Sequence, residues 1–292
     1  MSSFKNKSQI GHLLEINLAM LLISTSGALG RYVTLNPMVT IGVRALLACL
    51  LLYLYCSYKK ISFHVHVKDR LLIFISGVFL CIHWVTYFYS LQLSNVAIGM
   101  LSLFTYPVIT AFLEPFILKT KFEKAHLLLA LLVLFGVYYL APDLTIESSY
   151  TKAIGLGILS AFFYALRNLL LKKKGGKYNG SSLMFYQVAI TGLVLSPTLF
   201  FVDISFVFEQ WKPLLALAFL TTAIGHTLFL KSFKNFSITS ASILGSVQPV
   251  YGIILGIFFL DEIPSFRTVI GGMLILSSVV IESIRSFKKK AS

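Results

Sequence analysis

Residues 95–121 read NVAIGMLSLFTYPVITAFLEPFILKTK, and residues 237–263 read SITSASILGSVQPVYGIILGIFFLDEI. The two stretches align without a gap, so that Pro107 falls on Pro249 and each proline is followed by valine. Small or polar residues occupy the turns before both prolines. A match of this kind between two distant parts of one chain indicates an internal repeat.

The composition indicates an integral membrane protein. Hydrophobic residues make up 57% of the chain, charged residues make up 12%, and the mean hydropathy is +0.84. A soluble domain carries about 25% charged residues. The apolar runs are continuous and about 20 residues long, which is the length of a membrane-spanning helix and about twice that of a barrel strand. We therefore predict an all-α integral membrane protein with ten transmembrane helices, near residues 13–33, 37–57, 71–91, 96–118, 125–141, 153–171, 182–202, 212–232, 238–260 and 267–286.

The formal net charge of +14 reflects membrane topology. Most of the 25 Lys and Arg residues fall in alternate loops on the side of the two termini, whereas the other side collects Asp and Glu. The positive-inside rule then makes both termini of this multi-pass protein cytoplasmic, and an even number of crossings requires the same arrangement. The basic side attracts anionic membrane lipid, and we expect no nucleic-acid partner.

The repeat divides the chain into two halves, residues 1–146 and 147–292, with five predicted helices in each. An odd number of crossings per half places the second half upside down in the membrane. The charges agree with this, because KTKFEK after the fourth helix is basic and its counterpart DEIPSF after the ninth is not. Two inverted five-helix repeats are typical of secondary transporters, whose substrate site lies near mid-membrane where the repeats meet.

The chain resembles the ten-helix EamA-type members of the drug/metabolite transporter superfamily. The resemblance rests on TYPV in the fourth helix, on QPVYGIILGIFFLDE with Glu262 in the ninth, and on NPMVTIGVRALLA with Arg44 in the second. Thr120 stands where the family's helix-end glutamate would fall in the first half, so that role does not carry over. The resemblance implies a carrier of small metabolites in the cytoplasmic (inner) membrane, commonly an exporter.

The paired prolines mark the expected position of the substrate cavity. Proline removes a backbone donor and frees a carbonyl, and a helix broken in this way inside lipid normally borders protein-lined or water-filled space. Pro107 and Pro249 are therefore predicted helix breaks beside the cavity, with a simple packing kink as the alternative. The predicted polar contacts to substrate lie near these breaks or face them: Ser102, Tyr106, Tyr164, Ser246 and Gln248.

Glu114 lies two helical turns beyond Pro107 on the same helix face. A charge within a membrane span requires a partner or water. The functional hypothesis is that Glu114 binds a proton, as the coupling ion, or a cationic group of the substrate. The alternatives are an ion pair with Lys119 or Arg44, or a side chain that extends to the interface.

The third and eighth helices supply the remaining candidates. Trp84 and Tyr87, three residues apart, form the predicted aromatic wall of the cavity, while His83 is expected to turn away from it. An ordinary core or interfacial role is the alternative for these aromatic residues. His226 aligns with Trp84 in the repeat and is a candidate for substrate binding or proton transfer, or else a hydrogen-bonded structural histidine.

Two arginines complete the set of charges inside predicted helices. Arg44 lies about a third of the way in from the outer face, where it would either bind a carboxylate in a bidentate manner or form a structural ion pair. Arg167 lies near the inner end of its helix, and we expect its side chain to extend toward the interface.

The leading prediction is a secondary transporter that works by alternating access. The chain has no HExxH, no GxSxG and no pair of intramembrane carboxylates, so we expect neither an enzyme nor a bound cofactor or metal. A channel and a non-transporting membrane receptor are the alternative functions. The aromatic and acidic candidates suggest an amino acid, an amine or a similar small molecule as substrate. The sequence leaves the oligomeric state open.

Overall fold

The computed structural model describes residues 2–119, 124–140, 145, 147–172, 177–232, 245 and 247–291, and these residues form helices and connecting turns without any strand. Within them, seven helices are long and apolar enough to cross a membrane, and three shorter apolar helices cover Leu127–Leu140, Gln248–Leu260 and Phe266–Ile281. The helices are α1 Ser2–Tyr32, α2 Pro37–Tyr58, α3 Val67–Leu93, α4 Val96–Leu103, α5 Tyr106–Leu118, α6 Ala125–Leu140, α7 Ser149–Lys172, α8 Gly180–Leu195, η1 Ser196–Phe201, α9 Ile204–Glu209, α10 Trp211–Ala216, η2 Leu217–His226, α11 Thr227–Ser232, α13 Gln248–Leu260 and α14 Phe266–Ala291.

The prediction of an all-helical, multi-pass membrane protein is confirmed, whereas the ten crossings and the inverted repeat stay predictions. Two predicted spans differ in detail from the helices observed. The run at 96–118 is divided into α4 and α5. The run at 212–232 consists of α10, η2 and α11, in which η2 is a π-helix. Much of the predicted span at 238–260 lies outside the described residues.

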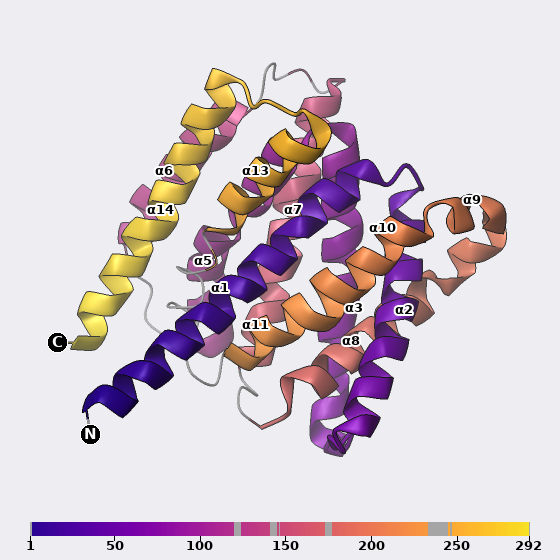
Figure 1. Ribbon diagram of the computed structural model, residues 1–292. Coiled ribbons are helices and arrows are strands. Elements are labelled where there is room, and N and C mark those ends of the chain that lie inside the picture. The colour runs from indigo at the N-terminus through magenta and orange to yellow at the C-terminus, as the bar shows by residue number, and fades with distance from the viewer. Residues whose placement is uncertain are drawn as a thin grey trace.

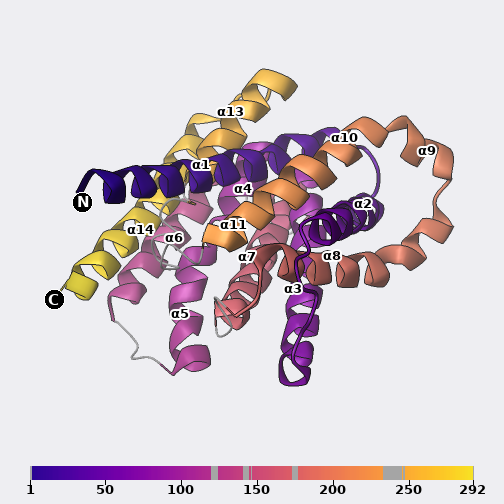
Figure 2. The ribbon, with the colours of Figure 1, turned by 60° about the horizontal axis from the view of Figure 1, so that its bottom comes forward.

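The helices pack as a bundle whose two chain termini lie at the same end (Figure 1). Figure 2 shows α1 running across the bundle, with α13 on one side and the α10–η2–α11 rod on the other. The most extensive neighbour pairs are α3 with α7, α2 with α8, and α6 with α14. We refer below to the end that holds the two termini as the terminal end and to the other as the distal end.

Asparagine residues set the starts of several helices. Asn36 accepts a hydrogen bond from the Met38 amide. Pro37 follows at the first helical position, where a backbone N–H would have no partner within the helix, so proline fits there at no cost. Asn95 in the same way accepts a hydrogen bond from the Ile98 amide, 2.8 Å away, at the start of α4. These caps satisfy backbone donors that would otherwise be exposed at helix ends.

Glycines allow pairs of helices to touch at their backbones. A Cβ atom at Gly271 of α14 would lie 2.6 Å from the carbonyl oxygen of Gly136 in α6. A Cβ atom at Gly157 of α7 would lie 2.4 Å from the Ser102 Cβ in α4. Gly252 of α13 faces Met100 of α4 within the same chain. Small residues of this kind let membrane helices approach closely and gain van der Waals contact.

Two short helices, α5 and α13, match in form. Each has 13 residues and begins with a residue followed by proline, at Tyr106 and at Gln248. Each is followed by a residue in the left-handed conformation, Lys119 with φ 57° and Asp261 with φ 55°. The local structure therefore repeats where the sequence repeats. It also places Pro107 and Pro249 in the first turns of separate helices, where proline is well tolerated.

Candidate functional site

A small cavity with mostly buried lining residues lies inside the bundle. Its volume is about 20 Å³, room for about one water molecule. Side chains from α1, α2, α3, α7 and η2, from the junction of α4 with α5 and from the start of α13 converge on it. The lining residues are Ile23, Ser26, Arg44, His83, Trp84, Tyr87, Leu103, Phe104, Tyr106, Tyr164, His226 and Gln248.

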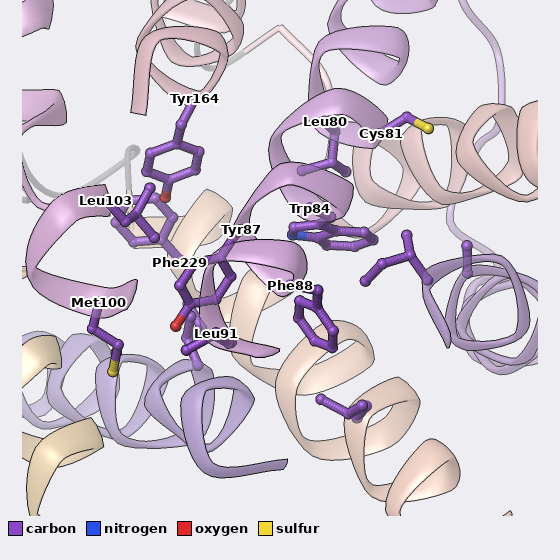
Figure 3. Close-up of a cluster of buried hydrophobic side chains, with 14 of the residues drawn as sticks. Leu80, Cys81, Trp84, Tyr87, Phe88, Leu91, Met100, Leu103, Tyr164 and Phe229 are labelled. Carbon is purple, nitrogen blue, oxygen red and sulfur yellow. The ribbon is translucent and has the colours of Figure 1, made fainter. Parts of the chain in front are cut away.

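Aromatic rings form most of the wall. Tyr164 of α7 meets the Tyr106 ring edge-on, with centroids 4.9 Å apart, and stacks on His83 at 4.5 Å. The Trp84 ring of α3 packs against His226 of η2 with centroids 5.5 Å apart. Figure 3 shows Trp84 and Tyr87 projecting from α3 and Tyr164 reaching the same cluster from a neighbouring helix. The site therefore offers flat, polarisable surfaces to a ligand.

The expectation that His83 turns away from the cavity is wrong. His83 and Tyr87 are four residues apart on α3 and share a face, with nearly parallel rings 6.3 Å apart. Because the cavity extends around α3 from α7 to η2, Trp84 also reaches it from the adjacent face. The Nδ1 atom of His83 lies 2.7 Å from the Ser160 hydroxyl, which in turn donates to the His83 backbone carbonyl. His83 is thereby fixed in the wall.

Arg44 has no acidic partner among the described residues. Its side chain is 1% exposed, its Nε donates to the Thr222 hydroxyl at 2.7 Å, and its guanidinium carbon lies 4.1 Å above the Trp84 ring. Both terminal nitrogens, Nη1 and Nη2, lack a hydrogen-bond partner within the part of the chain that the structure describes. The structural ion pair considered for Arg44 is therefore absent from that part of the structure.

Arg167 is buried, contrary to the expectation that it extends to the interface. Its Nη1 donates to Asn168 at 3.1 Å, and its Nη2 donates to Gln187 at 2.5 Å. The Gln187 amide donates in turn to Ser76 at 3.0 Å. Arg167 stays inside because the amide oxygens of Asn168, on its own helix, and of Gln187 on α8 accept its hydrogen bonds, and Ser76 on α3 holds Gln187 in place.

Glu114 lies outside the cavity. It forms an ion pair with Lys172, the last residue of α7, and both side chains are about one-third exposed. Neither Lys119 nor Arg44, the partners considered from the sequence, holds it. The partner of Glu114 was not predicted from the sequence, because Lys172 comes close only through the packing of α5 against α7. The structure thus assigns Glu114 a contact between two helix ends.

The other predicted site residues divide between cavity and surroundings. Ser102 donates to the Ile98 carbonyl at 2.7 Å and packs against Gly157, so it lies in a helix contact and not in the cavity wall. His226 lines the cavity, and its Nδ1 has no hydrogen-bond partner among the described residues. Ser246 lies outside the described residues. Those that line the cavity as expected in the sequence are Trp84, Tyr87, Tyr106, Tyr164, His226 and Gln248.

Ser26 is a cavity residue that the sequence analysis did not single out. It lies on α1 within the polar run Ser24, Thr25 and Ser26, which interrupts the apolar residues at 18–23 and 27–30. The Thr25 hydroxyl lies 3.0 Å from that of Thr221 in η2. The cluster of hydroxyl side chains on α1 was therefore the sequence signal that could have identified Ser26 as a cavity residue.

Ion pairs hold helix ends together on both sides of the cavity. At the distal end, Arg31 of α1 bonds to Glu262 beyond α13 at 2.9 Å, and the same carboxylate accepts the Val96 amide at the start of α4 at 2.8 Å. At the terminal end, Glu114 pairs with Lys172. Charged contacts therefore connect the helix ends above and below the cavity.

A larger groove of about 920 Å³ opens between α1, α10, η2 and α13. Its walls are mainly apolar, with Glu209, Gln210 and Lys212 among its polar lining residues. Thr25 lines the groove, and its neighbour Ser26 lines the central cavity. Adjacent residues of α1 therefore line the groove and the cavity.

Among the described residues, no group of three or more His, Cys, Asp or Glu side chains comes together. Cys49, Cys56 and Cys81 are free cysteines.

Comparisons with known proteins agree with a transport role. The model of the EamA-like transporter family matches twice, over residues 10–141 and over residues 151–284. The pseudopaline exporter CntI of Pseudomonas aeruginosa is 24% identical over 81% of this chain and 82% of its own length. An uncharacterized transporter of Archaeoglobus fulgidus is 28% identical over 67% of this chain and 70% of its own length.

Two further similarities extend the range of relatives. Solute carrier family 35 member G1 of Mus musculus is 24% identical over 78% of this chain and 66% of its own length. A protein of known crystal structure aligns over 95% of this chain and 98% of its own, with a TM-score of 0.68 and 16% identity. The last comparison shows a shared fold.

Proposed function

Because this chain belongs to the EamA-like transporter family, we propose that it carries a small metabolite across the membrane as a secondary active transporter, by alternating access to the central cavity. One observation carries this proposal: a small polar and aromatic cavity lies inside the bundle, and ion pairs join helix ends on both sides of it. A cavity between two contacts that can each break is the arrangement that alternating access requires.

The proposal includes ten crossings arranged as two inverted five-helix repeats, residues 1–146 and 147–292. The matched forms of α5 and α13 support it, as does a family model that fits each half of the chain separately. In such a protein, one repeat rocks against the other around a site near mid-membrane. Tyr106 and Gln248, at the starts of the matched helices, would contact the substrate from opposite repeats.

Each end of the cavity would open in turn. Opening the distal end separates Arg31 from Glu262, and the groove between α1, α10, η2 and α13 would then extend to the cavity past Thr25. Opening the terminal end separates Glu114 from Lys172. A transporter needs these contacts to be weak enough to break, and partly exposed ion pairs contribute only about 0–1 kcal/mol each.

The direction and location are also proposals. The concentration of Lys and Arg on the terminal side supports cytoplasmic termini and a place in the cytoplasmic (inner) membrane. Similarity to a protein named as an exporter supports export of a small metabolite, with an amino acid, an amine or a similar molecule in the range considered from sequence.

A proton is the coupling ion we propose, with His226 as its carrier. Arg44 and His226 line the same cavity, so His226 would take up a proton there only when a bound anion offsets the charge of Arg44. The His226 Nδ1 is a buried polar atom without a partner among the described residues. This part is tested in liposomes that contain the wild type or His226→Gln. The measurement is the uptake of a transported metabolite driven by a pH gradient. Gradient-dependent uptake that persists unchanged in the variant would remove His226 from the role.

The alternating-access proposal can be tested before the substrate is known. Cys49, Cys56 and Cys81 are replaced by alanine, and Ser26→Cys introduces one thiol into the cavity wall. Right-side-out and inside-out vesicles are treated with a membrane-impermeant thiol reagent. Ser57→Cys and Ser205→Cys, exposed near opposite ends of the bundle, serve as controls that each react from one side only.

We expect the thiol at position 26 to react from both sides of the membrane. Reaction from one side only would exclude alternating access around this cavity. A channel, the competing function, would show steady ionic conductance in a planar bilayer together with access from both sides, whereas a carrier shows saturable exchange.

A further inference from the structure

Arg44 places a positive charge in the wall of the cavity, and no described acidic residue pairs with it. The Nε atom and one face of the guanidinium are occupied by Thr222 and by Trp84. The two Nη atoms, which form the donor fork of the side chain, have no partner among the described residues. Thr222 and Trp84 therefore hold the side chain in place, while its two Nη atoms are buried without a hydrogen-bond partner among the described residues.

Arg167 is the internal comparison. It is equally buried, yet its two Nη atoms donate to Asn168 and Gln187, and Gln187 is itself held by Ser76. The protein thus supplies neutral acceptors to the Nη fork of Arg167, whose Nε has no partner among the described residues, and supplies one to the Nε of Arg44, whose fork has none there. This difference between two arginines of the same bundle indicates that the open fork of Arg44 is reserved for a ligand.

We propose that Arg44 binds the carboxylate of an organic acid, which makes the transported substrate an anion and not an amine; this inference rests on the proposed transport function of the same cavity. Two free Nη atoms in one plane match the two oxygens of one carboxylate. A phosphate dianion would bring a second negative charge, and among the described lining residues Arg44 alone is an arginine or a lysine. Buried charge in a membrane protein ordinarily has a partner, and the bound acid supplies it here.

The remainder of the substrate would lie against the aromatic wall. Trp84 extends beneath the Arg44 guanidinium, and Tyr106 and Tyr164 meet edge-to-face across the cavity. Flat or unsaturated groups pack well against such rings. The cavity volume of about 20 Å³ holds little more than water, so the acid would enter only when one end has opened and the wall has moved apart.

The experiment uses sets of small probes of similar size that carry a carboxylate, an uncharged amide or an ammonium group. One set is phenylacetate, phenylacetamide and 2-phenylethylamine, a second is acetate with acetamide, and inorganic phosphate is tested alone. Binding is measured as the slowing of alkylation of the Ser26→Cys thiol in the full-length, purified protein, and independently as a rise in the melting temperature.

We expect phenylacetate to slow alkylation at least tenfold at saturation, and the amide and amine to have no comparable effect. Arg44→Lys keeps the charge but lacks the planar fork, so we expect its apparent Kd for phenylacetate to rise about tenfold. Arg44→Gln should abolish protection. Arg70→Gln, at an exposed position near the start of α3, is the matched control and should bind as wild type does.

A structural role for Arg44 makes a different prediction. If Arg44 served to hold the fold, Arg44→Gln would lower the melting temperature of the ligand-free protein, whereas a binding arginine that lacks a partner should leave it unchanged or higher. Failure of the Gln variant to fold would count as that structural outcome, and the Lys variant would then test separately whether the planar fork is needed to bind phenylacetate.

The outcomes separate this inference from the transport function. If the Ser26→Cys thiol is accessible from both sides but no carboxylate protects it, or if the amine protects better, transport stands and the carboxylate site is wrong. Equal protection of Arg44→Gln by phenylacetate would also overturn the site, as would protection by phosphate alone. Access from one side only would overturn the transport mechanism itself.

Discussion

Trp84 and His226 are separated in sequence by the same interval as Pro107 and Pro249, and their rings meet in the wall of the central cavity, 5.5 Å apart and tilted by 53°. The contact joins α3 to η2, and Trp84 also carries the Arg44 guanidinium on its face. Positions matched in the sequence repeat therefore come together in space at the site we propose for transport.

Replacing Trp84 by leucine should weaken binding at the cavity. The change removes the ring beneath Arg44, and desolvated cation–π contacts contribute about 2 kcal/mol or more. We expect the Km for a transported acid to rise about tenfold. Trp211→Leu is the matched control, because Trp211 lies on α10 and is 53% exposed; a similar rise in that variant would point to a general effect on the bundle.

Breaking the distal ion pair should favour opening at that end. Glu262→Gln weakens the bond to Arg31 and the contact with the Val96 amide at the N-terminus of α4, which together account for about 1–2 kcal/mol. The thiol of Ser26→Cys should then react about five to thirty times faster from the distal side and no faster from the terminal side. Faster reaction from both sides would instead indicate a loosened bundle.

The terminal ion pair should behave as its counterpart. Glu114→Gln should speed reaction of the same thiol from the terminal side, while the affinity for substrate changes less than twofold because Glu114 does not line the cavity. Exchanging the charges, with Glu114→Lys and Lys172→Glu in one protein, should restore the wild-type rate. A large rise in Km for Glu114→Gln would contradict this and would indicate that Glu114 contacts the substrate.

Gly157→Ala should destabilise the protein. The added Cβ atom would lie 2.4 Å from the Ser102 Cβ, where α4 and α7 touch, and overpacking of this kind costs about 1–3 kcal/mol. Gly155→Ala is the control on the same helix, since nothing lies within 4 Å of its added Cβ atom. Melting temperatures in detergent measure both. Ser102→Gly should recover part of the loss, and equal effects at positions 155 and 157 would contradict the close contact.

The loop before α8 provides a prediction of pH dependence. Hydrogen bonding to Asp69 raises the pKa of Lys177 above its ordinary value of 10.5. Because the folded-state pKa is the higher one, the stabilisation is fully present below pH 10.5 and is lost as the pH rises through the folded-state value. Lys177→Met should therefore lower the melting temperature by an amount that is constant between pH 6 and 9.

The difference between Lys177→Met and wild type should shrink only above about pH 10.5. Lys68→Met, at an exposed neighbouring position, should have little effect at any pH. A difference that disappears between pH 6 and 9 would contradict the assigned role of Lys177.

Much of the cavity was predictable from the pattern of polar and aromatic residues in the sequence. Tyr106 and Gln248 were found through the repeated prolines, and Trp84 through its spacing from Tyr87. Ser102 was misplaced because a serine next to a helix break has the same sequence signal whether it faces a cavity or a neighbouring glycine. His83 was misplaced because helical periodicity specifies a face and does not specify how much of α3 the cavity surrounds.

The sequence by itself determined that this is an all-helical, multi-pass membrane protein of a transporter family, because apolar run length and repeated motifs are properties of local stretches of chain. Only the tertiary structure decided that Lys172 forms an ion pair with Glu114 and that no described acidic residue contacts Arg44. Which charges meet depends on how distant helices pack, and that packing is the sum of many small contacts that no single stretch of sequence contains.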